Sequence, residues 1–160
     1  MSATILDVLA ILERDRALHL VQPCSPRDLD LVEEALGRHL PAAFRALLQR
    51  IGGGILYDRH EVFGARRLIL HDIELVPDIL TIRRQLEEAG GMGPANLVPI
   101  HRCGPDLHLL DVSGGDGPSP VVDGAGRSWP DLPDFLADVV LPAKADASMG
   151  TTTPAAGRGL

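Results

Sequence analysis

The first part of the chain carries apolar residues at helical spacing. Between residues 4 and 20 they recur every three or four positions, and Thr4 followed by Asp7 resembles a capping box. This pattern predicts a helix over residues 4–20. The face that we expect it to bury consists of Ile5, Val8, Leu9 and Leu12.

Two further helices are predicted before residue 52. The second follows Ser25, which can cap it, with Pro26 at its first position and Asp28 near its positive end. Its buried face would consist of Leu29, Val32 and Leu36. The third helix opens at Pro41 and ends at Gly52, where a left-handed glycine can stop it. It would bury Phe44, Leu47, Leu48 and Ile51.

After these helices the pattern changes to that of strands. Residues 54–58 and 61–72 hold β-branched and aromatic residues, with turn chemistry at 58–60. Helical spacing returns over residues 76–91. Three short strands are then predicted at residues 96–100, 106–112 and 119–123.

The end of the chain combines one more helix with a tail. A helix over residues 132–141 would bury Leu132, Phe135, Leu136 and Val139. Residues 142–160 are rich in small residues without an apolar period, which predicts a flexible tail. The order of elements indicates an α+β fold: a single domain with a mostly antiparallel sheet packed by helices.

Charge and composition narrow the class of partner. The formal net charge is −7, and the residues from Cys103 onward hold eight acidic and three basic side chains. Nucleic-acid binding requires clustered basic residues, so we expect no nucleic-acid partner. An acidic protein of this kind suits a basic protein partner.

The sequence also indicates the compartment. Two cysteines, Cys24 and Cys103, do not form a disulfide framework and fit a reducing cytosol. The N-terminus has no basic region before its apolar residues, so we expect no signal peptide. No apolar run approaches the ~20 residues of a membrane helix. We therefore expect a cytoplasmic protein without a membrane partner.

The three glycines from Gly52 to Gly54 raise the question of a phosphate site. A phosphate-binding glycine loop leads into the N-terminus of a helix, where free N–H groups face the anion. Here the loop follows a helix, and its surroundings are unpaired carbonyl groups. The run is better explained as a helix stop and a tight entry into a strand.

Residues 101–111 hold the densest group of chemically capable side chains. The histidines and the cysteine there could bind a transition metal if they converged, but their spacing matches no ligand template. His108 and Leu110 share one face of a strand, and a half-exposed histidine on a turn or sheet face is the simpler interpretation. Neither cysteine lies in a nucleophile motif, and no serine lies in G-x-S-x-G. We therefore predict no catalytic residue, no metal site and no cofactor. The members of this stretch are His101, Cys103, Asp106, His108 and Asp111.

One section of the chain resembles a known family. A helix ending in E-x-x-L-G-x-x-L-P, followed by an apolar helix and two glycines, resembles the SUKH superfamily of Smi–Knr-type proteins. Residues 96–112 resemble the paired strands of that family, and residues 119–141 its closing strand and helix. The motif residues are Glu33, Leu36, Gly37, Leu40, Pro41, Phe44, Leu47, Leu48, Gly52, Gly53, Phe135 and Leu136.

The resemblance implies an organisation and a function. Residues 25–141 would form the SUKH-like α+β domain, residues 1–24 an N-terminal helix and linker, and residues 142–160 the tail. Family members lack catalytic machinery, and their motif residues are structural. Bacterial members act as immunity proteins that bind and neutralise a cognate toxin, which here would be a basic toxin domain. The alternatives are a regulatory interaction module with a non-toxin partner, and a small enzyme or metal-binding protein built on residues 101–108.

Five acidic residues are the candidates for contact with a basic partner. Charge complementarity speeds capture of such a partner. Three of the five fall on the strand ends and loops of the acidic C-terminal part, and two flank the turn at residues 58–60. The set is Asp58, Glu61, Asp106, Asp111 and Asp116.

Overall fold

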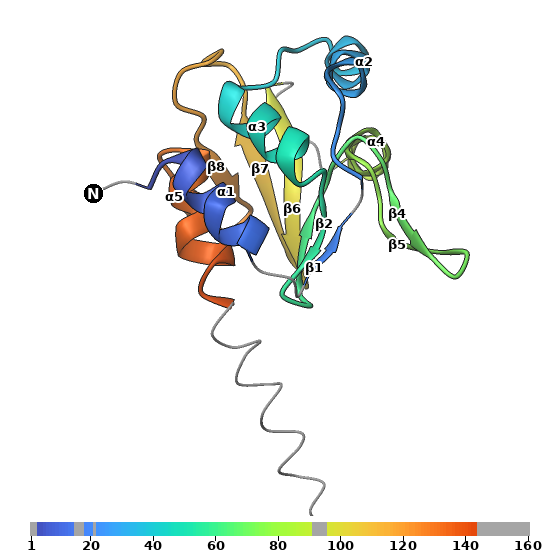
Figure 1. Cartoon of the computed structure of the whole chain (residues 1–160). Helices are drawn as coiled ribbons and strands as arrows, with labels where there is room; N and C mark the ends of the chain where they lie inside the picture. Colours follow the sequence, from blue (N-terminus) through green and yellow to red (C-terminus); the bar gives the residue numbers. More distant parts are fainter. Residues whose placement is uncertain (1–2, 15–17, 21, 91–95, 144–160) are drawn as a thin grey trace, which may run out of the picture.

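A seven-stranded sheet with only antiparallel neighbours forms the centre of the molecule (Figure 1). The structure is a computed structural model that describes residues 3–14, 18–20, 22–90 and 96–143. In spatial order the strands are β1 (Leu18–Leu20), β2 (Gly54–Leu56), β3 (His60–Val62), β6 (Leu97–Cys103), β7 (Asp106–Asp111), β8 (Val121–Asp123) and β9 (Ser128–Trp129). Strands β4 (Leu68–Leu70) and β5 (Ile73–Val76) form a separate two-stranded hairpin.

The helices form two groups around the sheet. They are α1 (Ile5–Arg14), α2 (Pro26–Leu36), α3 (Ala42–Arg50), α4 (Ile79–Glu88) and α5 (Leu132–Phe135), the last continuing as a π-helix, η1 (Leu136–Val140). Helices α1, α3 and α5 contact one another, and α4 contacts α2 and strand β6 (Figure 1). The predicted α+β class with a mostly antiparallel sheet is confirmed.

The helix starts that depend on local chemistry are as predicted. The amide of Asp7 donates to the Thr4 hydroxyl, and the Thr4 amide donates to the Asp7 carboxylate. Ser25 and Asp28 form the same reciprocal capping box at the start of α2. Gly37 then ends α2 in the left-handed conformation with φ 67°.

The predicted apolar faces are the faces that pack into the core. Every residue expected inside α2 and α3 is buried, and so are Val8, Leu9 and Leu12 on α1. Helix α1 therefore belongs to the same core as the rest of the domain. Ile5, at the edge of α1, is only partly buried.

Two secondary-structure predictions in the first half are wrong. Residues 18–20 are not helical, because they pair with β2 as the edge strand β1. Residues 61–72 are not one strand, because β3 ends at Val62 and Leu68–Leu70 belongs to the hairpin. The hairpin turns at His71 and Asp72, both at positive φ, and returns as β5. Strand β5 was not predicted: residues 73–75 were assigned to no element, and residue 76 was assigned to the following helix.

The last helix departs from the predicted spacing. The amide of Leu141 bonds to the carbonyl of Leu136, five residues earlier, as in a π-helix. This wider turn buries Val140 and leaves Val139, the residue predicted for the core face, only partly buried. Within the predicted tail, Ala143 is buried in the core, and residues 144–160 lie outside the described part of the chain.

The glycine run is a packing site between two segments of backbone. Gly52, Gly53 and Gly54 are buried and have φ of 83°, 104° and 132°, values that favour glycine. A β-carbon on Gly53 would lie 2.8 Å from the carbonyl oxygen of Val62. The glycines thus let α3 turn into β2 beneath the chain at Gly64, which agrees with the interpretation of the run as structural.

Candidate partner-binding surface

Three histidines from neighbouring strands form a buried chain of hydrogen bonds. Nδ1 of His60 lies 2.9 Å from Nε2 of His101, and Nδ1 of His101 lies 3.0 Å from Nδ1 of His108. Each of the three side chains is at most 5% exposed. Phe135 packs against the rings of His101 and His108. Because both nitrogens of His101 face other imidazoles, the three rings do not converge on a common point where a metal ion could sit.

The surroundings keep these histidines neutral. Burial lowers the pKa of His60 to about 4 and that of His101 to about 2, and it also lowers the pKa of His108. Nε2 of His108 has no hydrogen-bond partner among the described residues. No group of three or more histidine, cysteine or acidic side chains in the described ranges is placed to hold a metal ion. The cluster therefore acts as part of the core.

The five predicted acidic residues fall at two ends of the sheet. Asp58 lies in the turn between β2 and β3, and Asp106 begins β7 at the adjacent turn, and both are exposed. Glu61 is on β3 at this same end, but both its oxygens accept hydrogen bonds from Arg102, at 2.7 and 2.8 Å. The structure brings these three residues to one end of the molecule.

The other two acidic residues lie at the opposite end of β7. One oxygen of Asp111 accepts hydrogen bonds from Asn96 and from the amide and hydroxyl of Ser113. These bonds, led by that of the Ser113 hydroxyl, hold the pKa of Asp111 below its usual value. Asp116, in the loop between β7 and β8, is exposed and lies 3.3 Å from Nε2 of His39. The five residues are therefore not one continuous patch.

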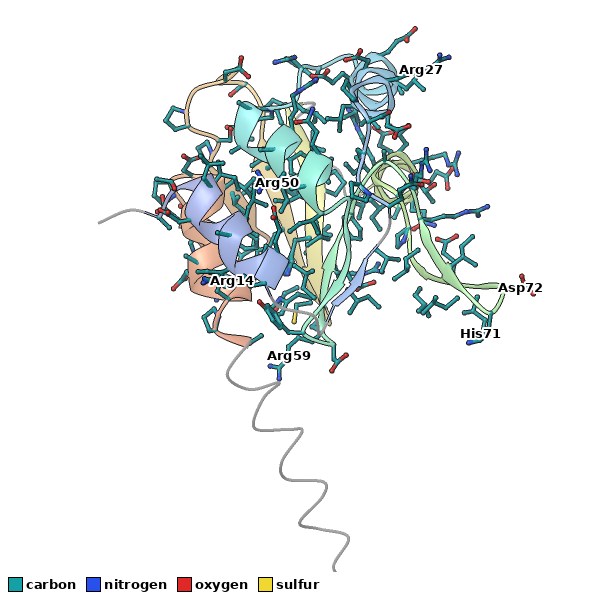
Figure 2. The ribbon with its side chains drawn as sticks, in the orientation of Figure 1. Arg14, Arg27, Arg50, Arg59, His71 and Asp72 are labelled. Atoms are coloured by element: carbon teal, nitrogen blue, oxygen red, sulfur yellow. The ribbon has the colours of Figure 1, made fainter. Side chains whose placement is uncertain are left out.

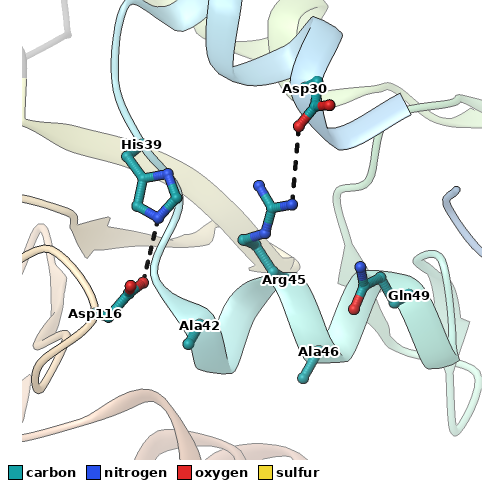
Figure 3. Close-up of a pocket in the computed structure, with 7 residues that line it drawn as sticks. All are labelled: Asp30, His39, Ala42, Arg45, Ala46, Gln49 and Asp116. Atoms are coloured by element: carbon teal, nitrogen blue, oxygen red, sulfur yellow. Dashed lines mark hydrogen bonds and ion pairs between the residues drawn. The ribbon is translucent and has the colours of Figure 1, made fainter. Parts of the chain in front are cut away.

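Asp116 forms one rim of a hollow on the outer surface of α3 (Figure 3). The hollow has a volume of ≈ 450 Å³. Asp30 on α2 forms another rim, with an oxygen 3.9 Å from Nη2 of Arg45. The lining residues are Asp30, His39, Ala42, Arg45, Ala46, Gln49 and Asp116.

Glu33 anchors the wall of this hollow from behind. Its carboxylate accepts hydrogen bonds from the amide of Leu40, at 2.6 Å, and from the guanidinium of Arg45. Nδ1 of His39 lies 2.7 Å from the same carboxylate. One family-motif residue therefore ties α2, the loop after it and α3 together.

The β4–β5 hairpin carries most of the exposed apolar surface. It projects away from the body, with His71 and Asp72 at its tip (Figure 2). Seven large hydrophobic side chains are exposed among the described residues, and five of them lie between residues 69 and 80. Four of them, Ile69, Leu70, Ile73 and Leu75, are on the hairpin, and Leu80 is at the start of α4. Exposed apolar side chains gathered in one region are typical of protein-binding surfaces.

The model of the SMI1 / KNR4 family (SUKH-1) matches residues 23–138 of the chain. The chain belongs to this family. The predicted SUKH resemblance is thereby confirmed, and the match includes the whole helix–L-P–helix–Gly-Gly section.

The fold of this SUKH-1 chain is similar to that of a solved structure. The crystal structure of a protein from Pseudomonas syringae pv. tomato is similar to it with a TM-score of 0.63 and 18% identity. The likeness covers 84% of this chain and 96% of that chain. No curated protein matches the SUKH-1 chain.

The sequence of this SUKH-1 chain did not indicate the residues that line the hollow on α3, nor the β4–β5 hairpin. Asp30, His39 and Arg45 gave no signal, because nothing local indicates that α2, α3 and the β7–β8 loop meet. The hairpin could have been found from residues 68–75, where apolar residues flank His71 and Asp72 at turn positions. Within the described residues, no helix has the length and apolar character needed to cross a membrane.

Proposed function

We propose that this chain is a non-catalytic protein-binding domain that acts as an immunity protein, binding and neutralising a cognate toxin of a bacterial toxin system. The observation that carries the protein-binding role is the projecting β4–β5 hairpin with its exposed apolar side chains. Leu70 and Ile73 are a cross-strand pair beside its tip and are 41% and 62% exposed. Exposing such an apolar pair to water is unfavourable, and burying it against a protein surface is favourable.

The hairpin's charges favour a protein contact of this kind. Arg67 and Glu74 pair with each other across the hairpin at 3.4 Å, and Arg66 pairs with Asp28 at the same distance. The basic groups near the apolar side chains are thus already matched within the domain. A patch of this composition suits an apolar protein surface better than a phosphate backbone.

Charge supports a basic toxin as the partner. Asp58, Asp106 and Asp116 are exposed and can contact basic side chains, whereas Glu61 and Asp111 are engaged in hydrogen bonds within the domain. The net charge of −7 adds attraction at a distance. The proposed contacts of a basic toxin are therefore the three exposed carboxylates, with Glu61 and Asp111 holding loops and strands in place.

The absence of catalysis is also part of the proposal. The three histidines that could act as general bases are buried in the core and hydrogen-bonded to one another. Burial raises the pKa of the Cys24 and Cys103 thiols, which disfavours the nucleophilic thiolate. These features support binding as the function and toxin neutralisation as its biological form.

The test is co-expression with the product of the adjacent gene. We expect the two proteins to co-purify and the chain to restore growth of cells that express the toxin. Changing both Leu70 and Ile73 to Ser should weaken binding at least tenfold. The matched control changes Leu6 and Leu31 to Ser; these residues are 64% and 53% exposed on α1 and α2, and the variant should bind like the unchanged chain. A toxin that is neither bound nor neutralised would disprove the immunity function, and equal affinity of the two variants would disprove the role of the hairpin.

A further inference from the structure

The hollow on α3 has a floor suited to an aliphatic side chain. Ala42 and Ala46 are one helical turn apart and therefore lie on the same face of α3. Their short side chains leave room that longer side chains would fill. Arg45 and Gln49 flank them, and the sides rise to α2 and the β7–β8 loop (Figure 3). The floor can accept the methylene stem of a long side chain lying along the helix.

The charge of the hollow is negative. Its surroundings hold three carboxylates, those of Asp30, Glu33 and Asp116, and one guanidinium, that of Arg45. Glu33 is the close partner of Arg45, so the charges of the two rim carboxylates are left in excess. Asp30 and Asp116 are 71% and 66% exposed, and their contacts within the domain, at 3.9 and 3.3 Å, are long.

His39 limits how far Asp116 is satisfied within the domain. Nδ1 of His39 lies 2.7 Å from Glu33, and Nε2 lies 3.3 Å from Asp116. The contact with Glu33 is the shorter of the two, and Asp116 is 66% exposed. The Asp116 carboxylate is therefore accessible to another donor.

We propose that this hollow accepts the side chain of an arginine or lysine from a protein partner. The cation lies between Asp30 and Asp116, and its methylene stem lies on Ala42 and Ala46. This inference rests on the proposed protein-binding function and adds the hollow to the hairpin as a second contact site for the partner. A guanidinium presents a planar fork of donors that matches a carboxylate, so arginine is the preferred occupant.

The test uses small probes in place of the partner. The purified full chain, labelled with ¹⁵N, is titrated by NMR with N-acetyl-arginine amide, N-acetyl-lysine amide and the neutral near-isostere N-acetyl-citrulline amide. We expect saturable shifts of the amides of Ala42, Ala46 and Asp116 with the two cationic probes, at a dissociation constant of about 1–10 mM. The citrulline probe should bind at least fivefold more weakly. Tighter binding of the arginine probe than of the lysine probe would favour the guanidinium.

A matched pair of variants separates the site from general attraction. Asp30→Asn with Asp116→Asn should weaken binding of the arginine probe at least fivefold. Glu87→Gln with Glu88→Gln removes the same charge at the exposed end of α4 and should leave binding unchanged. Equal weakening in both variants, or no saturable shifts near α3, would overturn the inference. Because the probes do not involve the toxin, that result would leave the co-expression test of the proposed function standing on its own.

Discussion

A β-carbon on Gly64 would lie 2.0 Å from the carbonyl oxygen of Gly52, so the two backbones meet in a space that admits only glycine. The neighbour is main chain and cannot rotate away, so a larger residue must displace β2 or the segment after β3. We predict that Gly64→Ala lowers the free energy of unfolding by about 3 kcal/mol or more. Urea unfolding followed by circular dichroism measures this loss.

The control for that prediction is Gly124→Ala. A β-carbon at Gly124 would meet no heavy atom within 4 Å, and the residue has no positive φ. Its stability should stay within about 0.5 kcal/mol of the unchanged chain. Similar losses in the two variants would contradict the close contact at Gly64.

The buried histidine chain predicts loss of stability in acid. The fold lowers the pKa of His60 from 6.5 to about 4 and that of His101 to about 2. Below pH 6.5 the unfolded chain therefore takes up protons that the folded chain does not. The free energy of unfolding therefore keeps its full value above pH 6.5 and falls as the pH is lowered toward 4. At pH 5 the loss is about 2 kcal/mol for His60 and about the same for His101. Urea titrations between pH 7.5 and 4.5 should show this decline.

Two variants identify the source of the acid effect. His101→Gln removes one titrating group, so it should lower stability at pH 7 and flatten the decline below pH 6.5. His71→Asn changes an exposed histidine at the hairpin tip, and asparagine tolerates its φ of 52°. That variant should keep the full decline. An unchanged slope in His101→Gln would rule out the histidine chain as its cause.

Glu33 should contribute more to stability than its neighbour on the same helix. Its carboxylate joins the Leu40 amide, Arg45 and His39, and is only 14% exposed. Glu33→Gln keeps the shape but removes the charge that these donors face, at a cost of about 1–3 kcal/mol. Glu34→Gln, at an exposed position, should change stability by less than about 0.5 kcal/mol. Thermal unfolding of both variants makes the comparison, and a neutral Glu33→Gln would show that the carboxylate does not anchor the loop.

Two residues on strand β5 of the hairpin should have separate roles, one in folding and one in binding. Val76 is buried in the core cluster, whereas Ile73, three residues earlier on the same strand, is 62% exposed. Val76→Ser should cost about 2 kcal/mol or more, because it removes apolar contacts and buries a hydroxyl. Ile73→Ser should fold with unchanged stability. Melting temperatures measure both, and a large loss in Ile73→Ser would mean that Ile73 supports the fold itself.

The parts of the fold that the sequence predicted are those with local causes. The caps at Thr4 and Ser25 and the apolar stripes of α2 and α3 depend on residues three or four positions apart. Strand β1 was missed because its three residues become a strand only by pairing with β2, more than thirty positions away. The π-turn places Val140 in the core in place of Val139. The sequence predicted Val139 because nothing in residues 136–140 indicates a π-turn.

The candidate site was less predictable for the same reason. The alternation on β7 correctly placed His108 and Leu110 on one face, but the expectation of a half-exposed histidine was wrong, because His101 and His108 are 1% and 2% exposed. The contact of His108 with His101, and of His101 with His60, depends on the register of three strands. Likewise, the two hydrogen bonds that Glu61 accepts from Arg102 depend on the pairing of β3 with β6, which the sequence does not indicate.

The wide turn at residues 136–140 takes up one residue that an ordinary helix would have no room for on the same face. A π-turn holds one residue more than an α-turn. Deleting Ala137 would return the helix to ordinary spacing and leave the residues after it on the faces that they now occupy. Val140 and Ala143 would stay buried, so this helix tolerates the loss of one residue at the turn without changing the direction of the chain that follows.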